Sequence, residues 1–284
     1  MATVRAVCFF AFFVFWVSVV RSADLTINVW VHGTNPAPEK IWMHERSPAR
    51  PWLYAQPGLH LSSGLPENYY FHRLGLLCQK SCAAWSAETF YVYGWPSTIP
   101  SAATRKIEGN KLFNSLNSLI EEQSKEYESI KIRLVGFSHG GNVILNMISC
   151  LPFFASGVEL EVVFLGTPVQ EATRDLINSP WVKRAYSFYT KSDWMQRIDM
   201  QKLQNLRADV PWFSQKVFHY DDQIIQIKLT IDGVSIGHRD YRSINHFLPK
   251  ILQQLDVLLP KDRKSDHIEF DFATRSENLE ACNA

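Results

Sequence analysis

The feature that most constrains this chain is a Gly-x-Ser-x-Gly pattern centred on Ser138. A strand-like run, residues 130–135, leads directly into the pattern, and a helix-like run, residues 140–150, follows it directly. The pattern alone arises by chance in about one chain in ten of this length, given ordinary glycine and serine frequencies. Between a strand and a helix, however, it predicts a sharp, strained turn that exposes the serine oxygen above the edge of a sheet. Gly136 and Gly140 would remove side chains that clash in such a turn.

Strand-like and helix-like segments alternate along most of the chain. We expect strands at residues 25–31, 89–93, 130–135, 160–165, 184–189 and 224–231. We expect helices at about residues 67–86, 104–127, 140–150, 169–177 and 243–258. Short apolar strands that are mostly separated by helices are typical of a parallel sheet covered on both faces. The predicted fold is therefore α/β, with a mostly parallel six-stranded sheet and helices on both faces.

The first 22 residues have the pattern of a targeting segment. Arg5 precedes an apolar run of 15 residues, 6–20, and residues of small or medium size occupy the −3 and −1 positions of a cleavage site after Ser22. This matches a secretory signal peptide, and the run is shorter than the roughly 17–25 residues that cross a bilayer. We expect a secreted or exported protein, periplasmic or extracellular, with one domain at residues 23–259. The alternative is a protein anchored in the membrane by residues 6–20.

Residues 260–284 form a C-terminal tail. Within it, residues 267–273 alternate apolar and polar side chains. This alternation fits an added edge strand, and the position at the chain end fits a disordered segment equally well. Both readings stay open.

Composition limits the partners of the protein. Its 29 basic and 28 acidic residues give a net charge of +1, which provides no electrostatic footprint for nucleic acid. The five cysteines are too few and too scattered for a disulfide scaffold, and no histidine stands at a zinc-binding spacing. We interpret Cys78, Cys82 and Cys150 as buried apolar residues and expect no metal.

Two long segments, residues 36–66 and 194–220, interrupt the alternation after the first and fifth expected strands. Long loops at the carboxyl edge of such a sheet usually shape a ligand site. Both are rich in large apolar side chains: Trp42, Trp52, Tyr54 and Leu59 in the first, and Trp194, Trp212 and Phe213 in the second. These side chains suit an apolar acyl group, with contact to a membrane or lipid surface. Ordinary packing over the sheet explains them equally well.

The chain resembles the α/β-hydrolase superfamily in its lipase- and esterase-like branch. The resemblance rests on the pattern around Ser138, on His32-Gly33 after the first strand, and on the order of elements over residues 25–259. Gly-Thr-Pro at residues 166–168 and Trp-Pro-Ser at 95–97 add weaker support. The chain looks like a compact member that lacks the two antiparallel strands with which many members begin.

The resemblance implies a catalytic triad in the chain order serine, acid, histidine. With Ser138 as nucleophile, Asp193 is the preferred acid because it lies just past the fifth expected strand, and Asp199 is the fallback. His238 lies in a loop ahead of the last helix, where the family places its histidine. The competing His246 falls on that helix, where a lone histidine is more often a packed or surface residue.

The same resemblance implies an oxyanion hole made of two backbone N–H groups. One belongs to His139, the residue after the nucleophile, and the other to Thr34 in the loop after the first strand. Gly33 would let that loop approach the substrate oxygen. His32 is interpreted as a structural residue that orients the loop through hydrogen bonds.

These expectations combine into a serine hydrolase that cleaves carboxylic esters through an acyl-enzyme intermediate, without metal or organic cofactor. Its substrate would be a small-molecule or lipid ester. A thioesterase or an amidase would use the same residues. A protein of another class, an exported binding protein on a hydrolase scaffold, is the further alternative.

Overall fold

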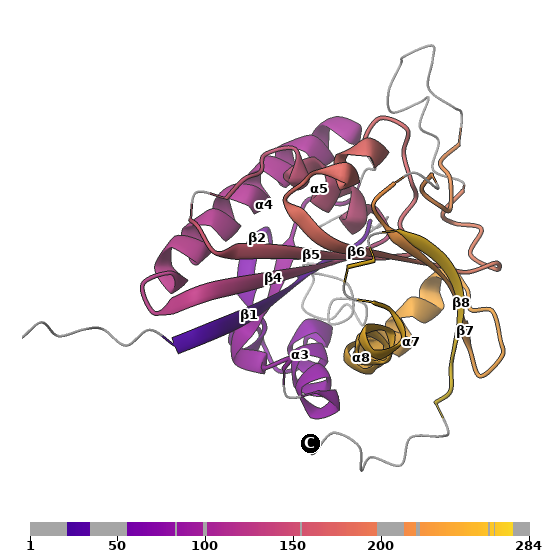
Figure 1. The fold of residues 1–284 in the computed structure, drawn as a ribbon, viewed down its shortest axis with the longest axis horizontal. Helices are drawn as coiled ribbons and strands as arrows, with labels where there is room; N and C mark the ends of the chain where they lie inside the picture. Colours follow the sequence, from indigo (N-terminus) through magenta and orange to yellow (C-terminus); the bar gives the residue numbers. More distant parts are fainter. Residues whose placement is uncertain are drawn as a thin grey trace, which may run out of the picture.

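A computed structural model describes residues 22–34, 56–82, 84–98, 101–153, 155–197, 213–219, 222–260, 262–263 and 265–274. These residues form one twisted sheet with helices on both faces (Figure 1). The strands are β1 Ser22–Val31, β2 Gly58–Leu61, β3 Phe90–Gly94, β4 Tyr127–Phe137, β5 Val158–Leu165, β6 Val182–Tyr189, β7 Ile225–Ile231 and β8 Asp266–Phe272. The helices are α3 Tyr70–Ser81, α4 Ala102–Gln123, α5 His139–Ile148, α7 Tyr241–Ile244 and α8 Leu248–Leu258.

The sheet has the order β2-β3-β1-β4-β5-β6-β7-β8. Only the β2–β3 pair is antiparallel, and every other neighbouring pair is parallel. The central strands are mainly apolar because helices cover both of their faces. The predicted α/β class with a mostly parallel sheet is thus confirmed.

The sheet has eight strands rather than the six expected. The additional β2 lies inside the segment 36–66 and is only four residues long, so it has too few residues to show a period of two. It gives the sheet one antiparallel edge strand, although the chain still enters the sheet through β1. The additional β8 lies in the tail, where Phe270 and Phe272 turn toward the core and the strand pairs with β7.

One expected helix is also absent from the structure. Residues 169–177 were expected to be helical, but the chain there forms an irregular loop that ends in a single 3-10 turn, Arg174–Asn178. The loop begins with an isolated bridge between Val169 and Gln215, whose backbone groups exchange two hydrogen bonds of 2.9 Å. Pairing of these backbone groups with a distant segment takes the place of the local helical bonds.

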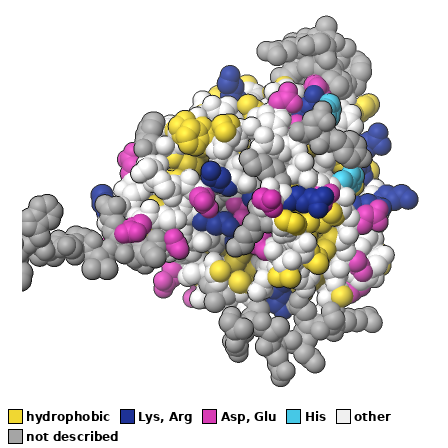
Figure 2. Space-filling model, viewed as in Figure 1, with side chains coloured by type: hydrophobic (Ala, Val, Ile, Leu, Met, Phe, Trp, Pro, Cys, Tyr) yellow, Lys and Arg dark blue, Asp and Glu magenta, His cyan; other side chains and the backbone are white. Residues whose placement is uncertain are grey.

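Two apolar layers hold the helices to the sheet. On one face lie α4 and α5, and α3 and α8 lie on the other (Figure 1). In α4 the buried Leu112, Leu116 and Ile120 follow each other at a spacing of four residues, so they form one stripe against the sheet. The exposed surface in Figure 2 mixes acidic and basic side chains, in keeping with a net charge of +1.

The cysteine interpretation holds only in part. Cys78 is buried in the layer between α3 and the sheet, whereas Cys82 and Cys150 are half-buried. All three carry free thiols. Burial raises the pKa of the Cys78 thiol far above its usual range, so this thiol stays neutral.

A row of polar side chains crosses the sheet beneath α3 and α8. Asn28, Arg133, Glu161 and Arg184 stand opposite one another on β1, β4, β5 and β6. Arg133 forms an ion pair with Glu161 and donates to Asn28 Oδ1 at 3.2 Å. Lys131 Nζ lies 2.6 Å from Glu161 Oε2. Burial alone would raise the pKa of Glu161, but the charges of Arg133 and Lys131 outweigh it and hold the pKa below its ordinary value.

We expect Glu161→Gln to lower the free energy of unfolding by about 3–5 kcal/mol, because it leaves Arg133 buried without its counter-charge. Since the folded state holds the Glu161 pKa low, this stabilisation is present above the ordinary carboxyl pKa and is lost as pH falls through the folded value. Urea titrations at several pH values measure both effects. Glu269→Gln is the control, because its ion pair with Lys228 lies on the surface and should change stability little. Equal effects of the two substitutions would contradict the prediction.

Candidate active site

Ser138 occupies the sharp turn between β4 and α5. Its backbone has φ 52° and ψ −130°, a strained conformation for a residue other than glycine. Its N–H donates to Leu165 O at 2.9 Å, and its carbonyl accepts from Gly141 N at 3.0 Å. The following helix passes so close to β1 that a Cβ at residue 140 would lie 2.2 Å from Val31 O. Glycine is therefore required at position 140, and the turn holds the serine oxygen at the carboxyl edge of the sheet.

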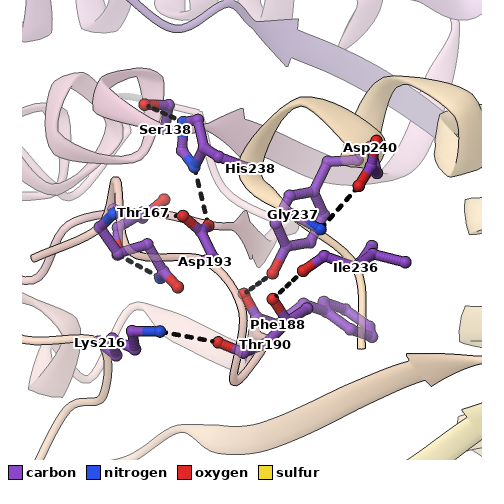
Figure 3. Close-up of polar contacts among 12 residues, drawn as sticks. Ser138, Thr167, Phe188, Thr190, Asp193, Lys216, Ile236, Gly237, His238 and Asp240 are labelled. Carbon is purple, nitrogen blue, oxygen red and sulfur yellow. Dashed lines mark hydrogen bonds and ion pairs between the residues drawn. The ribbon is translucent and has the colours of Figure 1, made fainter. Parts of the chain in front are cut away.

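His238 lies between Ser138 and Asp193 (Figure 3). Its Nε2 is 3.0 Å from Ser138 Oγ, and its Nδ1 is 2.8 Å from Asp193 Oδ2. A carboxylate can only accept, so Nδ1 carries the proton and Nε2 is left to accept from the serine hydroxyl. The structure thus brings together the three residues expected as nucleophile, base and acid.

Of the two fallback residues, the structure describes only His246. Asp199 lies outside the described residues. His246 lies in the 3-10 turn Asn245–Phe247, where its ring contacts that of Phe247 at a centroid distance of 3.9 Å. Its backbone carbonyl accepts from Ser81 on α3. These contacts fit a packed residue rather than a base.

The three side chains meet because they follow three strands that end at the same edge of the sheet, β4, β6 and β7. Strand β5 ends between them at Leu165 and is followed by Gly166, which has φ +56°. A Cβ there would lie 2.9 Å from Asp193 Oδ2 and 3.3 Å from His238 Nδ1. Gly166 therefore leaves the space that the Asp193–His238 pair occupies.

The acid and histidine loops are joined to each other directly. Thr190 Oγ1 donates to Ile236 O, and Ser192 N donates to Ser235 Oγ at 3.1 Å. Lys216 Nζ donates to the carbonyls of Thr190 at 3.0 Å and of Lys191 at 2.9 Å (Figure 3). Sequence reasoning missed Lys216, because no local pattern links a lysine to carbonyls more than 20 residues away.

Packing holds the imidazole and the acid in place. The His238 ring lies 5.1 Å from the Phe137 ring and 6.4 Å from the Tyr241 ring, centroid to centroid. Asp193 is fully buried, and its Oδ1 accepts from Gln196 N at 3.3 Å. Burial, reinforced by the Asp193 charge, raises the pKa of Tyr241 well above its ordinary value, so the tyrosine stays neutral.

Asp240 closes the turn that contains His238, because its carboxylate accepts from Gly237 N at 2.7 Å.

The two expected oxyanion-hole segments lie beside Ser138. A Cβ at Gly33 would lie 2.9 Å from Ser138 Cβ, so the loop after β1 passes directly against the nucleophile. Thr34 follows in that loop and is half-buried. His139 is buried and begins α5. Thr34 and His139 thus belong to the two segments that flank Ser138.

His32 ties the loop after β1 to β3. Its Nδ1–H donates to Gly33 O at 2.8 Å, while its Nε2 accepts from Trp95 N at 3.1 Å. Trp95 Nε1 donates back to His32 O at 2.7 Å, and the two rings stack at 5.8 Å. Burial lowers the pKa of His32 from 6.5 to about 4, against the opposing effect of its hydrogen bond to Gly33. His32 is therefore a neutral structural residue.

The large apolar side chains of the two long segments differ in how far they are buried. Trp194 and Phe213 are 63% and 53% exposed, so they do not close over the sheet as core. Leu59 is half-buried in β2 and packs against the core. Trp42, Trp52, Tyr54 and Trp212 lie outside the described residues.

Within the described ranges, no helix is both long and apolar enough to cross a membrane. The same ranges contain no cluster of three or more histidine, cysteine or acidic side chains that could hold a metal ion.

Comparison with known proteins adds little. No family model and no curated protein matches this chain. One similar solved structure is an extracellular α/β-hydrolase from a Paenibacillus species, described as sharing structural and functional homology with tobacco salicylic acid binding protein 2. It is 13% identical, with 88% of this chain and 90% of that chain covered and a TM-score of 0.28. Another is a lipase-esterase related protein from Clostridium acetobutylicum, 11% identical, with coverages of 87% and 85% and a TM-score of 0.28. Likenesses this weak carry no argument about chemistry.

We expect His32 to make the protein less stable in mild acid. The unfolded chain binds a proton at the imidazole near pH 6.5, whereas the folded chain does so only near pH 4. The free energy of unfolding should therefore fall by about 3 kcal/mol as pH drops across this window. His32→Gln removes the group that titrates, so this pH-dependent loss of stability disappears. The urea midpoints of the variant should therefore vary less between pH 7 and pH 4 than those of the wild type. Parallel pH profiles for the two proteins would contradict the buried, neutral assignment.

Proposed function

We propose that this protein is a serine hydrolase that cleaves carboxylic esters through an acyl-enzyme intermediate. The observation that carries the proposal is the continuous chain of hydrogen bonds from Asp193 through His238 to Ser138, with the serine on a strained turn. A nucleophile, a base within hydrogen-bond reach and a third group that orients the base are the parts that this chemistry requires.

In the first half-reaction, His238 Nε2 takes the hydroxyl proton of Ser138 as Oγ attacks the ester carbonyl carbon. The carbonyl π electrons move onto oxygen and form a tetrahedral oxyanion. When the oxyanion collapses, the bond to the alcohol oxygen breaks and His238 gives its proton to the departing alcohol. Water then attacks the acyl-serine with the same base, which releases the carboxylic acid and restores the serine hydroxyl.

Asp193 supports the charged imidazole that forms during each step. Because it is fully buried and 2.8 Å from Nδ1, its carboxylate holds the ring in one tautomer and stabilises the added positive charge. The backbone N–H groups of Thr34 and His139 receive the oxyanion in this proposal. Each such donor typically contributes about 3 kcal/mol to transition-state stabilisation.

The ester assignment rests on the apolar surface beside the acid loop. The exposed Trp194 directly follows Asp193, and the exposed Phe213 belongs to the same long segment, so apolar surface adjoins the acid loop. Apolar surface near the catalytic residues favours a substrate with an apolar acyl group, either a small ester or a lipid at a surface. Thioesters and amides remain alternatives, because the same residues would attack them. A purely binding role is disfavoured by the complete set of Ser138, His238 and Asp193, because binding alone does not need a base in hydrogen-bond contact with a serine hydroxyl.

Serine-directed labelling tests the nucleophile. A fluorophosphonate should label the wild type at neutral pH and fail to label Ser138→Ala. Ser187→Ala is the matched control, because Ser187 is a buried serine on the neighbouring β6 and should leave labelling intact. Asp193→Asn should lower kcat by about 10⁴-fold, because the imidazole loses its preferred tautomer. Wild-type protein that neither labels nor hydrolyses matched esters, thioesters or amides would point instead to the binding role.

We also propose that residues 1–22 are a cleaved signal peptide, which makes the protein secreted. Ser22 is the first residue of β1, where it pairs with Tyr127. Cleavage after Ser22 would therefore remove one residue from the amino end of β1 and leave the rest of the strand in place. N-terminal sequencing of the exported protein should then begin at Ala23. A sequence that still contains residues 6–20 would establish the membrane-anchored alternative.

A further inference from the structure

A buried polar cluster joins α4, α5 and the loop after β5 beside the nucleophile. Arg105 lies in the first turn of α4 and is fully buried. Its Nη1 lies 3.2 Å from His139 Nδ1, and its Nη2 donates to Gln170 Oε1 at 3.2 Å. His139 and Gln170 are themselves buried. A cationic side chain is thus in direct contact with the residue that follows Ser138.

The donors around His139 determine its protonation. A guanidinium has five N–H groups and no acceptor, so it can only donate to His139 Nδ1. Asn142 Nδ2 lies 3.5 Å from the same Nδ1 and donates to Pro168 O at 3.0 Å. Because a backbone carbonyl can only accept, this second bond fixes the orientation of the Asn142 amide. His139 Nδ1 must therefore be unprotonated, which makes the ring neutral with its proton on Nε2.

The contact acts on the proposed oxyanion hole through one residue. His139 is the first residue of α5, and its backbone N–H is the donor assigned to the oxyanion. Two side-chain torsions separate the ring from that backbone, so a ring held by Arg105 restricts the position of the N–H. The guanidinium also places a positive charge in a buried region, where an attraction to developing negative charge is weakly screened.

We propose that Arg105 is a positioning residue of the oxyanion hole, which fixes His139 as the neutral Nε2–H tautomer and holds its backbone N–H toward the reacting oxygen. This inference rests on the proposed hydrolase function. It assigns to α4 a part in the reaction beyond covering the sheet.

The tautomer is tested without any substrate. In ¹⁵N-labelled wild-type protein, the His139 ring should show an unprotonated Nδ1 and a protonated Nε2 across neutral pH. In Arg105→Met the Nδ1 loses its guanidinium donor, so the signals should shift toward a mixture of tautomers. A wild-type ring with a proton on Nδ1 would overturn the inference, whether or not the protein proves to be a hydrolase.

Kinetics test the positioning role. Arg105→Met should lower kcat by about tenfold and leave KM within about twofold, because the lost interaction acts on the transition state. The affinity for a trifluoromethyl ketone, which forms an oxyanion on Ser138, should fall by a similar factor. Arg105→Lys keeps the charge without the planar fork and should recover part of the loss. A change in KM alone, or an unchanged kcat, would overturn the inference.

Arg133→Met is the control for a loss of activity that comes only from lower stability. It removes another buried arginine, which lies on β4 and forms an ion pair with Glu161. It should lower the unfolding free energy yet leave kcat of the folded protein unchanged. If Arg105→Met does not fold, His139→Gln supplies the second variant, because glutamine keeps an acceptor for Arg105 and should retain more activity than His139→Leu. Absence of hydrolysis or labelling in the wild type would refute the proposed function, and the ring signals would still decide the tautomer.

Discussion

The close approach of α5 to the end of β1 is the constraint on which the rest of the site depends. Residue 140 lies so near Val31 O that only glycine fits, and a Cβ at residue 33 would lie 2.9 Å from the Cβ of Ser138. This packing keeps Ser138 at a positive φ that a free chain would avoid. With the turn held, the start of α5, the loop after β1 and the hydroxyl of Ser138 have fixed relative positions.

Buried charge is handled differently within the strands and at their carboxyl ends. In the middle of β4 and β5, Glu161 forms ion pairs with Arg133 and Lys131. At the carboxyl edge, Asp193 faces an imidazole that would gain a positive charge only during the reaction. The ion pairs of Glu161 stabilise the fold. In the proposed reaction, the positive charge that forms on His238 pairs with Asp193. Such separation agrees with the rule that binding and reaction occur at the carboxyl ends of parallel strands.

Prediction from the sequence succeeded where the signal lies within one segment. The six expected strands are all present, because each is a mainly apolar run whose apolar side chains pack into the core. For residues 267–273 it left an edge strand and a disordered segment equally open, and pairing with β7 makes residues 266–272 the strand β8. It failed for β2, whose four residues pair with β3. It failed also for residues 169–177, where Val169 pairs with Gln215 instead of continuing a helix. Arg105 and Lys216 gave no sequence signal, since an arginine or lysine within a helix or loop usually points to solvent.

The sequence by itself determined the strand-turn-helix geometry around Ser138 and the α/β class, because both follow from side-chain size and period over about ten neighbouring residues. The sequence made Asp193 and His238 the preferred partners of Ser138, but only the tertiary structure brought the imidazole beside the hydroxyl and the carboxylate beside the imidazole. His238 is 100 residues from Ser138 and 45 from Asp193, and their meeting depends on three strands ending at one edge with glycine at position 166 between them. Contacts over such separations are set by packing of the whole sheet, and no local pattern encodes them.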